Sequence, residues 1–166
     1  MIILAIDPGT TRSAALLYDS GGRRVLHWAM YDNARLADQL RGGMFGPEHW
    51  PWSLTAIEMI ASYGMAVGRD VFETCVWIGR FLEASPVRTE LAFRRDIKLH
   101  LCGSARARDP NIRQALMDMF GGERAARGTK RDPGPLYGVA THGWAALAVA
   151  VYVADMADHT SCKKEG

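Results

Sequence analysis

The sequence opens with Met1-Ile2-Ile3-Leu4-Ala5-Ile6-Asp7-Pro8-Gly9-Thr10-Thr11, in which an apolar run ends at a single carboxylate and a turn. An apolar run without a charge before Asp7 is typical of a strand buried on both faces of a sheet. Pro8-Gly9 predicts that the strand ends directly after the carboxylate. A desolvated carboxylate is costly unless it has a partner, so two interpretations follow: Asp7 binds a metal ion, or it only caps the Pro-Gly turn.

An apolar strand with one acid appears again in the middle of the chain. Residues 54–60 contain a single charged residue, Glu58, and an isolated glutamate in such a run usually has a function. Earlier, residues 13–18 and 23–31 are β-favouring segments on either side of a Gly-rich turn, which predicts an antiparallel meander with the first strand. Residues 87–91 predict a short edge strand.

Helical periodicity predicts four helices, bounded mainly by capping residues, prolines and glycines. Their ranges are 33–41, which Asp32 or Asn33 caps, 69–84, 109–120 and 137–158. The apolar stripe of the second helix is interpreted either as core or as a dimer seam. Residues 123–135 are basic and contain Gly and Pro, so we expect a mobile loop, and residues 159–166 predict a frayed polar tail.

Composition indicates an ordinary globular protein with one domain. The chain has 166 residues, 48% hydrophobic and 23% charged, and its net charge of +2 does not by itself indicate nucleic-acid binding. Residues 88–131 are nevertheless mainly basic, which suits either a phosphate-binding surface or a solvated face. Cys75, Cys102 and Cys162 lack the spacing of a disulfide framework or a zinc site, so we expect a reducing cytoplasm. No apolar run reaches transmembrane length, so we expect no membrane association.

Asp7, Glu58 and a histidine near the far end of the chain form a candidate metal site. His142 follows Thr141 at the start of the last predicted helix. Two carboxylates and an imidazole suit divalent cations, and a pair of such ions stabilises the attacking and leaving oxygens in phosphodiester hydrolysis. Three roles are open for His142: metal ligand, general base, or solvent-exposed residue at a helix start.

These residues resemble the RuvC-type Holliday junction resolvases, which are members of the RNase H-like (retroviral integrase) superfamily. The resemblance is carried by Ile6-Asp7-Pro8-Gly9-Thr10 on a first strand, Ile57-Glu58 on a later strand, and His142 before an Ala- and Leu-rich segment. Ile97-Lys98-Leu99-His100-Leu101-Cys102-Gly103 is similar to the basic segment with which that family approaches DNA phosphates. The chain as a whole, including residues 128–139, is most similar to phage-encoded versions.

The resemblance implies an α/β fold of the RNase H-like type over residues 1–158, as a single nuclease domain. We expect a mixed five-stranded sheet of order 3-2-1-4-5 with helices on both faces. The first three strands are expected to be antiparallel and the later ones parallel to the first, so that the acids meet at the carboxyl end of the central strands. A homodimer is expected, joined through the helix face at residues 72–82.

The resemblance also implies which residues act. The expected metal ligands, for two Mg²⁺ ions with Mn²⁺ as an alternative, are Asp7, Glu58 and His142. Lys98 matches a phosphate-contacting lysine, and Tyr63 and Met65 lie where the family inserts a bulky side chain at the junction crossover; loop packing is their alternative role. The full set of expected DNA contacts is Tyr63, Met65, Arg94, Arg95, Lys98, Arg108 and Lys130.

The chain departs from the family pattern at one position. Where the family has an aspartate one helical turn after the histidine, this sequence has Ala145, which cannot bind a metal ion. Asp155 is no replacement, because it lies roughly 20 Å further along the predicted helix. Asp132 on the preceding loop, or a water held by His142, are the alternatives. Catalysis is then weakened, uses a different metal or is absent.

Several functions follow from these observations. The first is a metal-dependent endodeoxyribonuclease that cleaves Holliday junctions and other branched DNA, and the second is a non-catalytic junction-binding relative. A nuclease acting on RNA–DNA hybrids is a further alternative. Asp-Pro-Gly-Thr-Thr also resembles a phosphate loop of actin-like ATPases, but 166 residues supply only one of their two lobes, so we expect no nucleotide cofactor. The expected location is the cytoplasm of a bacterial host cell.

Overall fold

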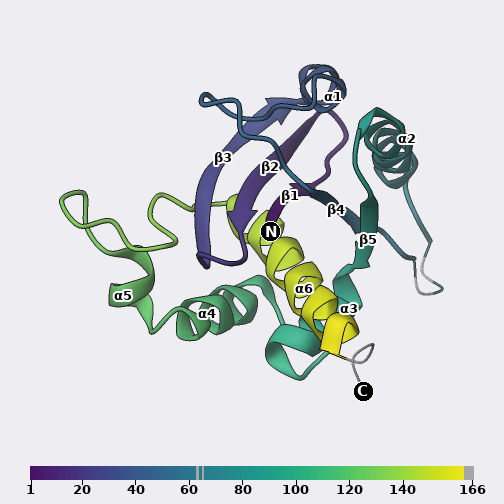
Figure 1. Cartoon of the computed structure of the whole chain (residues 1–166). Helices are drawn as coiled ribbons and strands as arrows, with labels where there is room; N and C mark the ends of the chain where they lie inside the picture. The colour runs from purple at the N-terminus through teal and green to yellow at the C-terminus, as the bar shows by residue number, and fades with distance from the viewer. Residues whose placement is uncertain (63, 65, 163–166) are drawn as a thin grey trace.

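The computed structural model describes residues 1–62, 64 and 66–162. Within this part of the chain, a five-stranded mixed sheet is covered by helices on both faces (Figure 1). The strands are β1 (Ile2–Asp7), β2 (Arg12–Asp19), β3 (Arg24–Asp32), β4 (Leu54–Met59) and β5 (Thr89–Phe93). The helices are α1 (Asn33–Arg41), α2 (Arg69–Ala84), α3 (Arg94–Cys102), α4 (Asp109–Met119), α5 (Glu123–Arg127) and α6 (Gly143–Cys162).

The sheet has the predicted order, β3-β2-β1-β4-β5. β1 pairs antiparallel with β2 and parallel with β4, and β5 adds in parallel to β4. Ile6 lies opposite Ile57 in the parallel register, so the next positions along the two strands, Asp7 and Glu58, are neighbours. The pairing therefore brings the two acids together at the carboxyl end of the central strands, as predicted.

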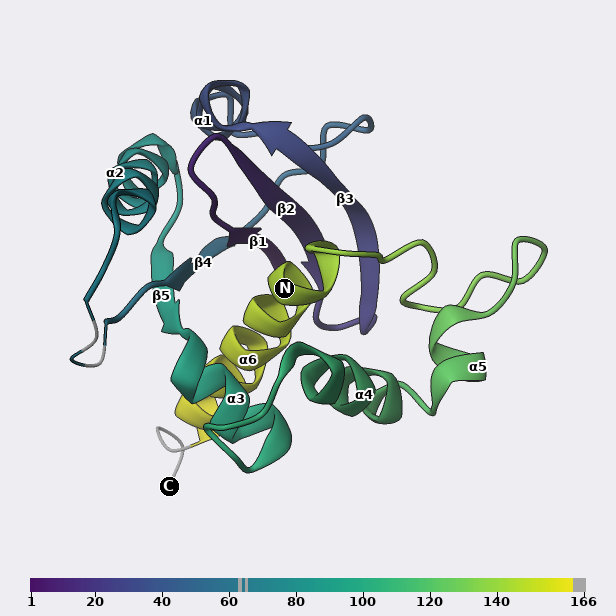
Figure 2. The same ribbon diagram turned by 180° about the vertical axis from the view of Figure 1, so that it is seen from behind.

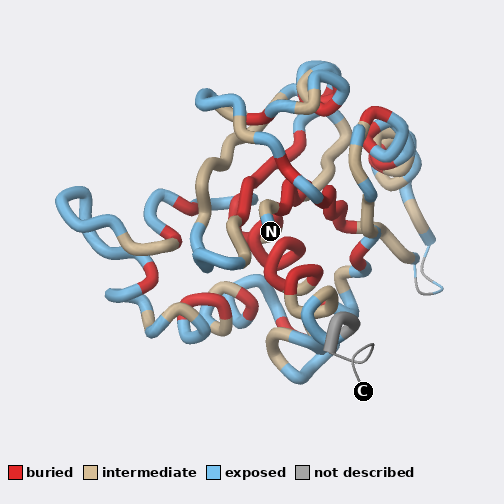
Figure 3. The backbone as a smooth tube through the Cα atoms, viewed as in Figure 1, coloured by how far each residue is buried: buried red, intermediate tan, exposed pale blue. Residues whose placement is uncertain are grey.

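Each face of the sheet packs against its own set of helices. Leu4 and Ile6 belong to a core cluster with α1 and α2, whereas Ile3 and Ala5 belong to the cluster that α6 dominates, with α3 and α4 beside it (Figures 1 and 2). Burial is concentrated in the central strands and in α6 (Figure 3). β1 is thus buried on both faces, which explains why its residues show no polar alternation.

The last helix begins later than predicted. α6 starts at Gly143 rather than at residue 137, because the preceding segment contains turns in which Gly138 and Thr141 have positive φ angles of 79° and 41°. An α-helix does not accommodate such angles. His142 therefore directly precedes the helix instead of lying within its first turn.

Two segments that were predicted to lack regular structure are partly helical. α5 lies inside the predicted loop 123–135, where an ion pair of 3.4 Å between Arg127 and Glu123 spans the helical turn. At the other end, no Gly or Pro interrupts residues 155–162, so α6 continues to Cys162 and into the predicted tail. Residues 163–166, the rest of that tail, lie outside the described residues.

A buried polar network holds the turn after Asp7. The Gly9 N–H donates to Oγ of Ser13 over 3.2 Å, the Ser13 hydroxyl donates to Oδ1 of Asn33 over 2.7 Å, and Nδ2 of Asn33 donates to the Gly9 carbonyl over 2.8 Å. Ser13 and Asn33 are both fully buried. A side chain at Gly9 would place its Cβ 2.4 Å from the Arg12 carbonyl oxygen, so the turn requires glycine.

Replacing Asn33 by alanine should destabilise the protein by about 1–3 kcal/mol, because it leaves the buried Ser13 hydroxyl and the half-buried Gly9 carbonyl without their partners. Urea unfolding followed by circular dichroism measures this change. Gln114→Ala, on the exposed surface of α4, is the matched control and should change stability by no more than about 0.5 kcal/mol. Equal effects of the two substitutions would contradict the role given to the network.

Candidate active site

Both acids lie on the face of the sheet that α6 covers. Side chains alternate along a strand, so Asp7 shares this face with Ile3 and Ala5, and Glu58 shares it with Ala56. The two side chains are only 17% and 11% exposed, respectively. The sheet therefore holds two largely desolvated carboxylates beside the start of α6.

His142 contacts the first of these carboxylates. Its Nδ1 lies 3.1 Å from Oδ2 of Asp7, while the imidazole itself is 66% exposed. The ring is positioned by the turn before α6, in which the Ala145 and Ala146 N–H groups both donate to the His142 carbonyl. The Asp7 side chain thus engages the histidine, and the Pro-Gly turn is held by the network of Ser13 and Asn33.

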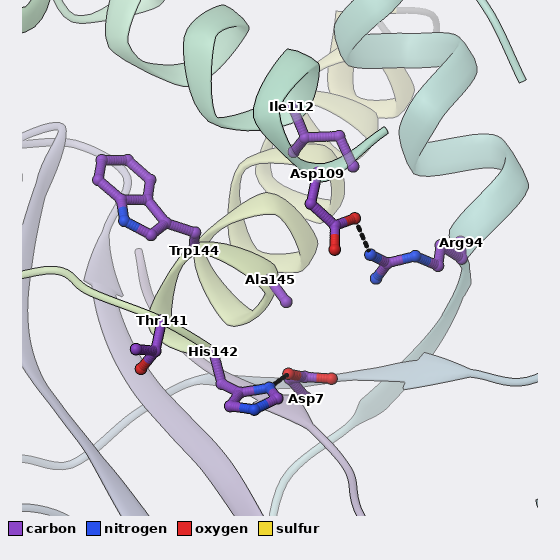
Figure 4. Close-up of a pocket in the computed structure, with 8 residues that line it drawn as sticks. All are labelled: Asp7, Arg94, Asp109, Ile112, Thr141, His142, Trp144 and Ala145. Atoms are coloured by element: carbon purple, nitrogen blue, oxygen red, sulfur yellow. Dashed lines mark hydrogen bonds and ion pairs between the residues drawn. The ribbon is translucent and has the colours of Figure 1, made fainter. Parts of the chain in front are cut away.

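Glu58 is bound by an arginine that the sequence analysis had assigned to DNA. Nη1 of Arg94 donates to both carboxylate oxygens of Glu58, over 2.9 and 3.1 Å. Nη2 of the same side chain donates to Asp109 (Figure 4). Arg94 begins α3 directly after β5, and Asp109 begins α4. Sequence reasoning did not single out Asp109, because an acid beside a proline at a helix start is ordinary in any helix.

Two adjacent cavities share Arg94 as a wall. One, of about 360 Å³, is lined by Asp7, Arg94, Asp109, Ile112, Thr141, His142, Trp144 and Ala145 (Figure 4). The other, of about 330 Å³, is lined by Glu58, Met59, Ile60, Ala61, Arg94, Arg95, Lys98 and Ala105. The arginine therefore stands between the Asp7 side and the Glu58 side of the site.

Burial raises the pKa of both acids. Burial raises the pKa of Asp7 above its ordinary value of 3.8, although the hydrogen bond and charge of His142 oppose the rise. Burial likewise raises the pKa of Glu58 above 4.5 against the opposing charge of Arg94, and the neighbouring Asp7 adds to the increase. Burial lowers the pKa of Arg94, but Glu58 and Asp109 outweigh it and raise that pKa, so the guanidinium stays charged.

The donor atoms suit a divalent metal ion, although the side chains are not gathered around one. Among the described residues, no group of three or more His, Cys, Asp or Glu side chains lies close enough to hold a metal ion as it stands. Asp7, Glu58 and His142 nevertheless supply two hard oxygen donors and an imidazole. Because both carboxylates are desolvated and one raises the pKa of the other, a cation beside them would be favourable.

Ala145, at which the sequence departs from the family pattern, carries no atom that could bind a metal ion. Its methyl group lines the cavity together with Asp7 and His142 (Figure 4). Asp132, one of the alternatives from the sequence, lines a different cavity near α5, and its N–H donates to Oγ1 of Thr129. Besides Asp7, the acid that lines this cavity is Asp109.

The remaining candidate DNA contacts are spread over the molecule. Arg95 and Lys98 on α3 line the cavity beside Glu58, and Arg108 precedes α4 next to Asp109. Lys130 is exposed in the loop after α5, and this segment projects away from the sheet (Figures 1 and 2). Tyr63 and Met65 lie outside the described residues. The structure thus brings Arg95 and Lys98 to the site and leaves Lys130 on a projecting arm.

The fold is shared with RuvC. The structure of Thermus thermophilus RuvC aligns with a TM-score of 0.66 at 18% identity, covering 95% of this chain and 97% of that one. A structure of T. thermophilus RuvC in complex with a Holliday junction substrate aligns with a TM-score of 0.60, also at 18% identity, covering 94% and 96% of the two chains. No protein-family model and no curated protein sequence matches this chain. The fold is therefore the RNase H-like fold of RuvC-type Holliday junction resolvases, as predicted.

Replacing Asp7 by asparagine should raise the melting temperature at pH 7 in the absence of divalent ions. The raised pKa means that the folded state binds more protons than the unfolded state between pH 3.8 and the raised value, so stability falls as the pH rises through this window. The asparagine removes that loss, and the difference from the wild type should vanish as the pH approaches 4. Thermal unfolding from pH 4 to 8 measures it.

Asp38→Asn is the matched control, because Asp38 is 78% exposed. The melting temperature of this variant at pH 7 should not exceed that of the wild type. A melting temperature of Asp7→Asn below that of the wild type at pH 7 would show that the ionised carboxylate stabilises the fold.

Proposed function

We propose that this protein is a metal-dependent, structure-selective endodeoxyribonuclease that cleaves Holliday junctions and other branched DNA. The observation that carries the proposal is the pairing of Asp7 and Glu58 on adjacent parallel strands, beside His142, in the fold of RuvC. The Holliday junction bound by T. thermophilus RuvC in one of the similar structures supports the choice of substrate. A phage origin, and a location in the cytoplasm of a bacterial host cell, are proposed from the sequence alone.

We propose Mg²⁺ as the metal, with Mn²⁺ as an alternative, and Asp7, Glu58 and His142 as the residues that hold it. Such an ion supplies charge stabilisation to the attacking and leaving oxygens of phosphodiester hydrolysis. Asp7 and Glu58 contribute negative charge from rigid strands, and His142 orients Asp7. The sequence predicts two ions per site. The number that binds depends on whether the Arg94 guanidinium stays between Glu58 and Asp109.

DNA is proposed to approach through phosphate contacts from the basic residues around the site. Arg95 and Lys98 line the cavity beside Glu58, where their charge favours a phosphate next to the acids. Recognition of phosphates and of junction shape makes binding strongly salt-dependent.

Among the described residues, no helix has both the length and the apolar character needed to cross a membrane.

The protein is proposed to act as a homodimer, because paired nicks across a junction require two sites. The α2 stripe, which the sequence predicts to be either core or dimer seam, is only partly buried in the core. Ile78 and Phe81 are buried in the core, whereas Phe72 and Val76 are 62% and 56% exposed. Exposed apolar side chains of this size on one helix suit a protein–protein contact.

The experiment is nicking of a labelled four-way junction with Mg²⁺ and, separately, Mn²⁺. The wild type should produce paired nicks related by the two-fold symmetry of the junction. Glu58→Gln should lower the rate by more than about 100-fold while junction binding persists, because the side chain keeps its size and loses its charge. Glu48→Gln, at an exposed loop position, is the matched control and should nick at the wild-type rate.

Other outcomes would select among the alternative functions. Ala145 favours a second candidate, a junction-binding protein without catalysis, which predicts a salt-sensitive complex and no nicks with either metal. Cleavage of an RNA–DNA hybrid in place of the junction would retain the fold and contradict the substrate. A single nick per junction would contradict the dimer.

A further inference from the structure

Arg94 forms a positively charged bridge between two acids at the candidate active site. Nη1 contacts both oxygens of Glu58 and Nη2 contacts Asp109, so one guanidinium joins β4 to the start of α4. Figure 4 shows the contact with Asp109. The arginine is half-buried and the glutamate is 11% exposed. The charge-assisted contact with Glu58 is among the stronger polar interactions and is partly shielded from solvent, whereas the Asp109 side chain is 78% exposed.

The bridge is built by the fold rather than by chance rotation of a long side chain. Met59 pairs with Phe93 in the parallel register of β4 and β5, so Arg94 begins α3 one residue beyond the end of Glu58's own strand. α3 and α4 pack against each other and against α6, which sets the position of Asp109. Three elements therefore converge on the guanidinium.

The buried negative charge at the bridge comes from two carboxylates, Asp7 and Glu58. Arg94 already lies against Glu58, and Arg95 and Lys98 line the same cavity. One divalent cation beside Asp7 is balanced by the two carboxylates, whereas a second cation beside Glu58 would meet the positive charge of Arg94.

We propose that Arg94 takes the place of one of the two metal ions predicted from the sequence, so that the site binds a single divalent ion on the Asp7 side. This inference rests on the proposed metal dependence of the same site. The guanidinium is permanently protonated and can stabilise negative charge on a bound phosphate. Asp109 is then a positioning residue that holds Arg94 against Glu58, and the absence of a carboxylate at Ala145 agrees with a site that needs fewer negative charges.

The test counts bound Mn²⁺ ions by electron paramagnetic resonance, without DNA. The wild-type protein should bind one Mn²⁺ per chain. Arg94→Gln removes the cation between Glu58 and Asp109, so this variant should bind two. Arg94→Lys retains the charge and should still bind one, as should Arg35→Gln, a matched control on the exposed surface of α1. Circular dichroism verifies that each variant is folded.

Two ions on the wild type, no ion on the wild type, or one ion on folded Arg94→Gln would each overturn the inference. If Arg94→Gln does not fold, Asp109→Asn provides the second variant. This variant removes one negative charge from the Asp7 cavity and the partner that holds Arg94 against Glu58, so the Kd of the single Mn²⁺ should rise at least tenfold, and an unchanged Kd would overturn the inference. Junction nicking by the wild type is measured separately, so two bound ions with normal nicking would contradict this inference and leave the proposed function intact.

Discussion

The parallel pairing of β1 with β4 is the constraint on which the site depends. It places Asp7 and Glu58 side by side on one face of the sheet, in a place where neither is well hydrated. Two neighbouring desolvated carboxylates are unfavourable, and the rest of the site supplies their partners. His142 contacts one acid and Arg94 the other. The sheet thus places two acids that need partners, and the residues at the starts of α3 and α6 supply them.

Much of the fold could be predicted from hydrophobic patterns because those patterns report burial directly. The uninterrupted apolar runs of β1 and β4 indicated central strands, and the acid near the end of each run indicated where the site lies. The start of α6 was predicted six residues early, since Tyr137 to His142 contains no proline and its turn depends on backbone angles at Gly138 and Thr141. Helix α5 was missed because it is only one turn long and lies among loop-forming residues.

The partners of Glu58 could not be predicted, because they are set by tertiary packing. Arg94 reads in the sequence as one member of a basic stretch, and Asp109 as an ordinary acid at a helix start. Only the convergence of β5, α3 and α4 makes them a bridge over Glu58. The same convergence separates the Asp7 cavity from the Glu58 cavity. It also brings Asp109 to the Asp7 cavity, where this residue supplies a negative charge that Ala145 lacks.

The most direct measurement is anomalous X-ray scattering from Mn²⁺ in crystals of the protein bound to a four-way junction. The account predicts an anomalous peak in direct contact with the Asp7 carboxylate, in the cavity that His142 also lines, and no peak at this position in Asp7→Asn. A junction complex in which this cavity shows no peak, or in which Mn²⁺ binds only at sites remote from Asp7 and Glu58, would contradict the claim that the paired acids form a metal-dependent active site.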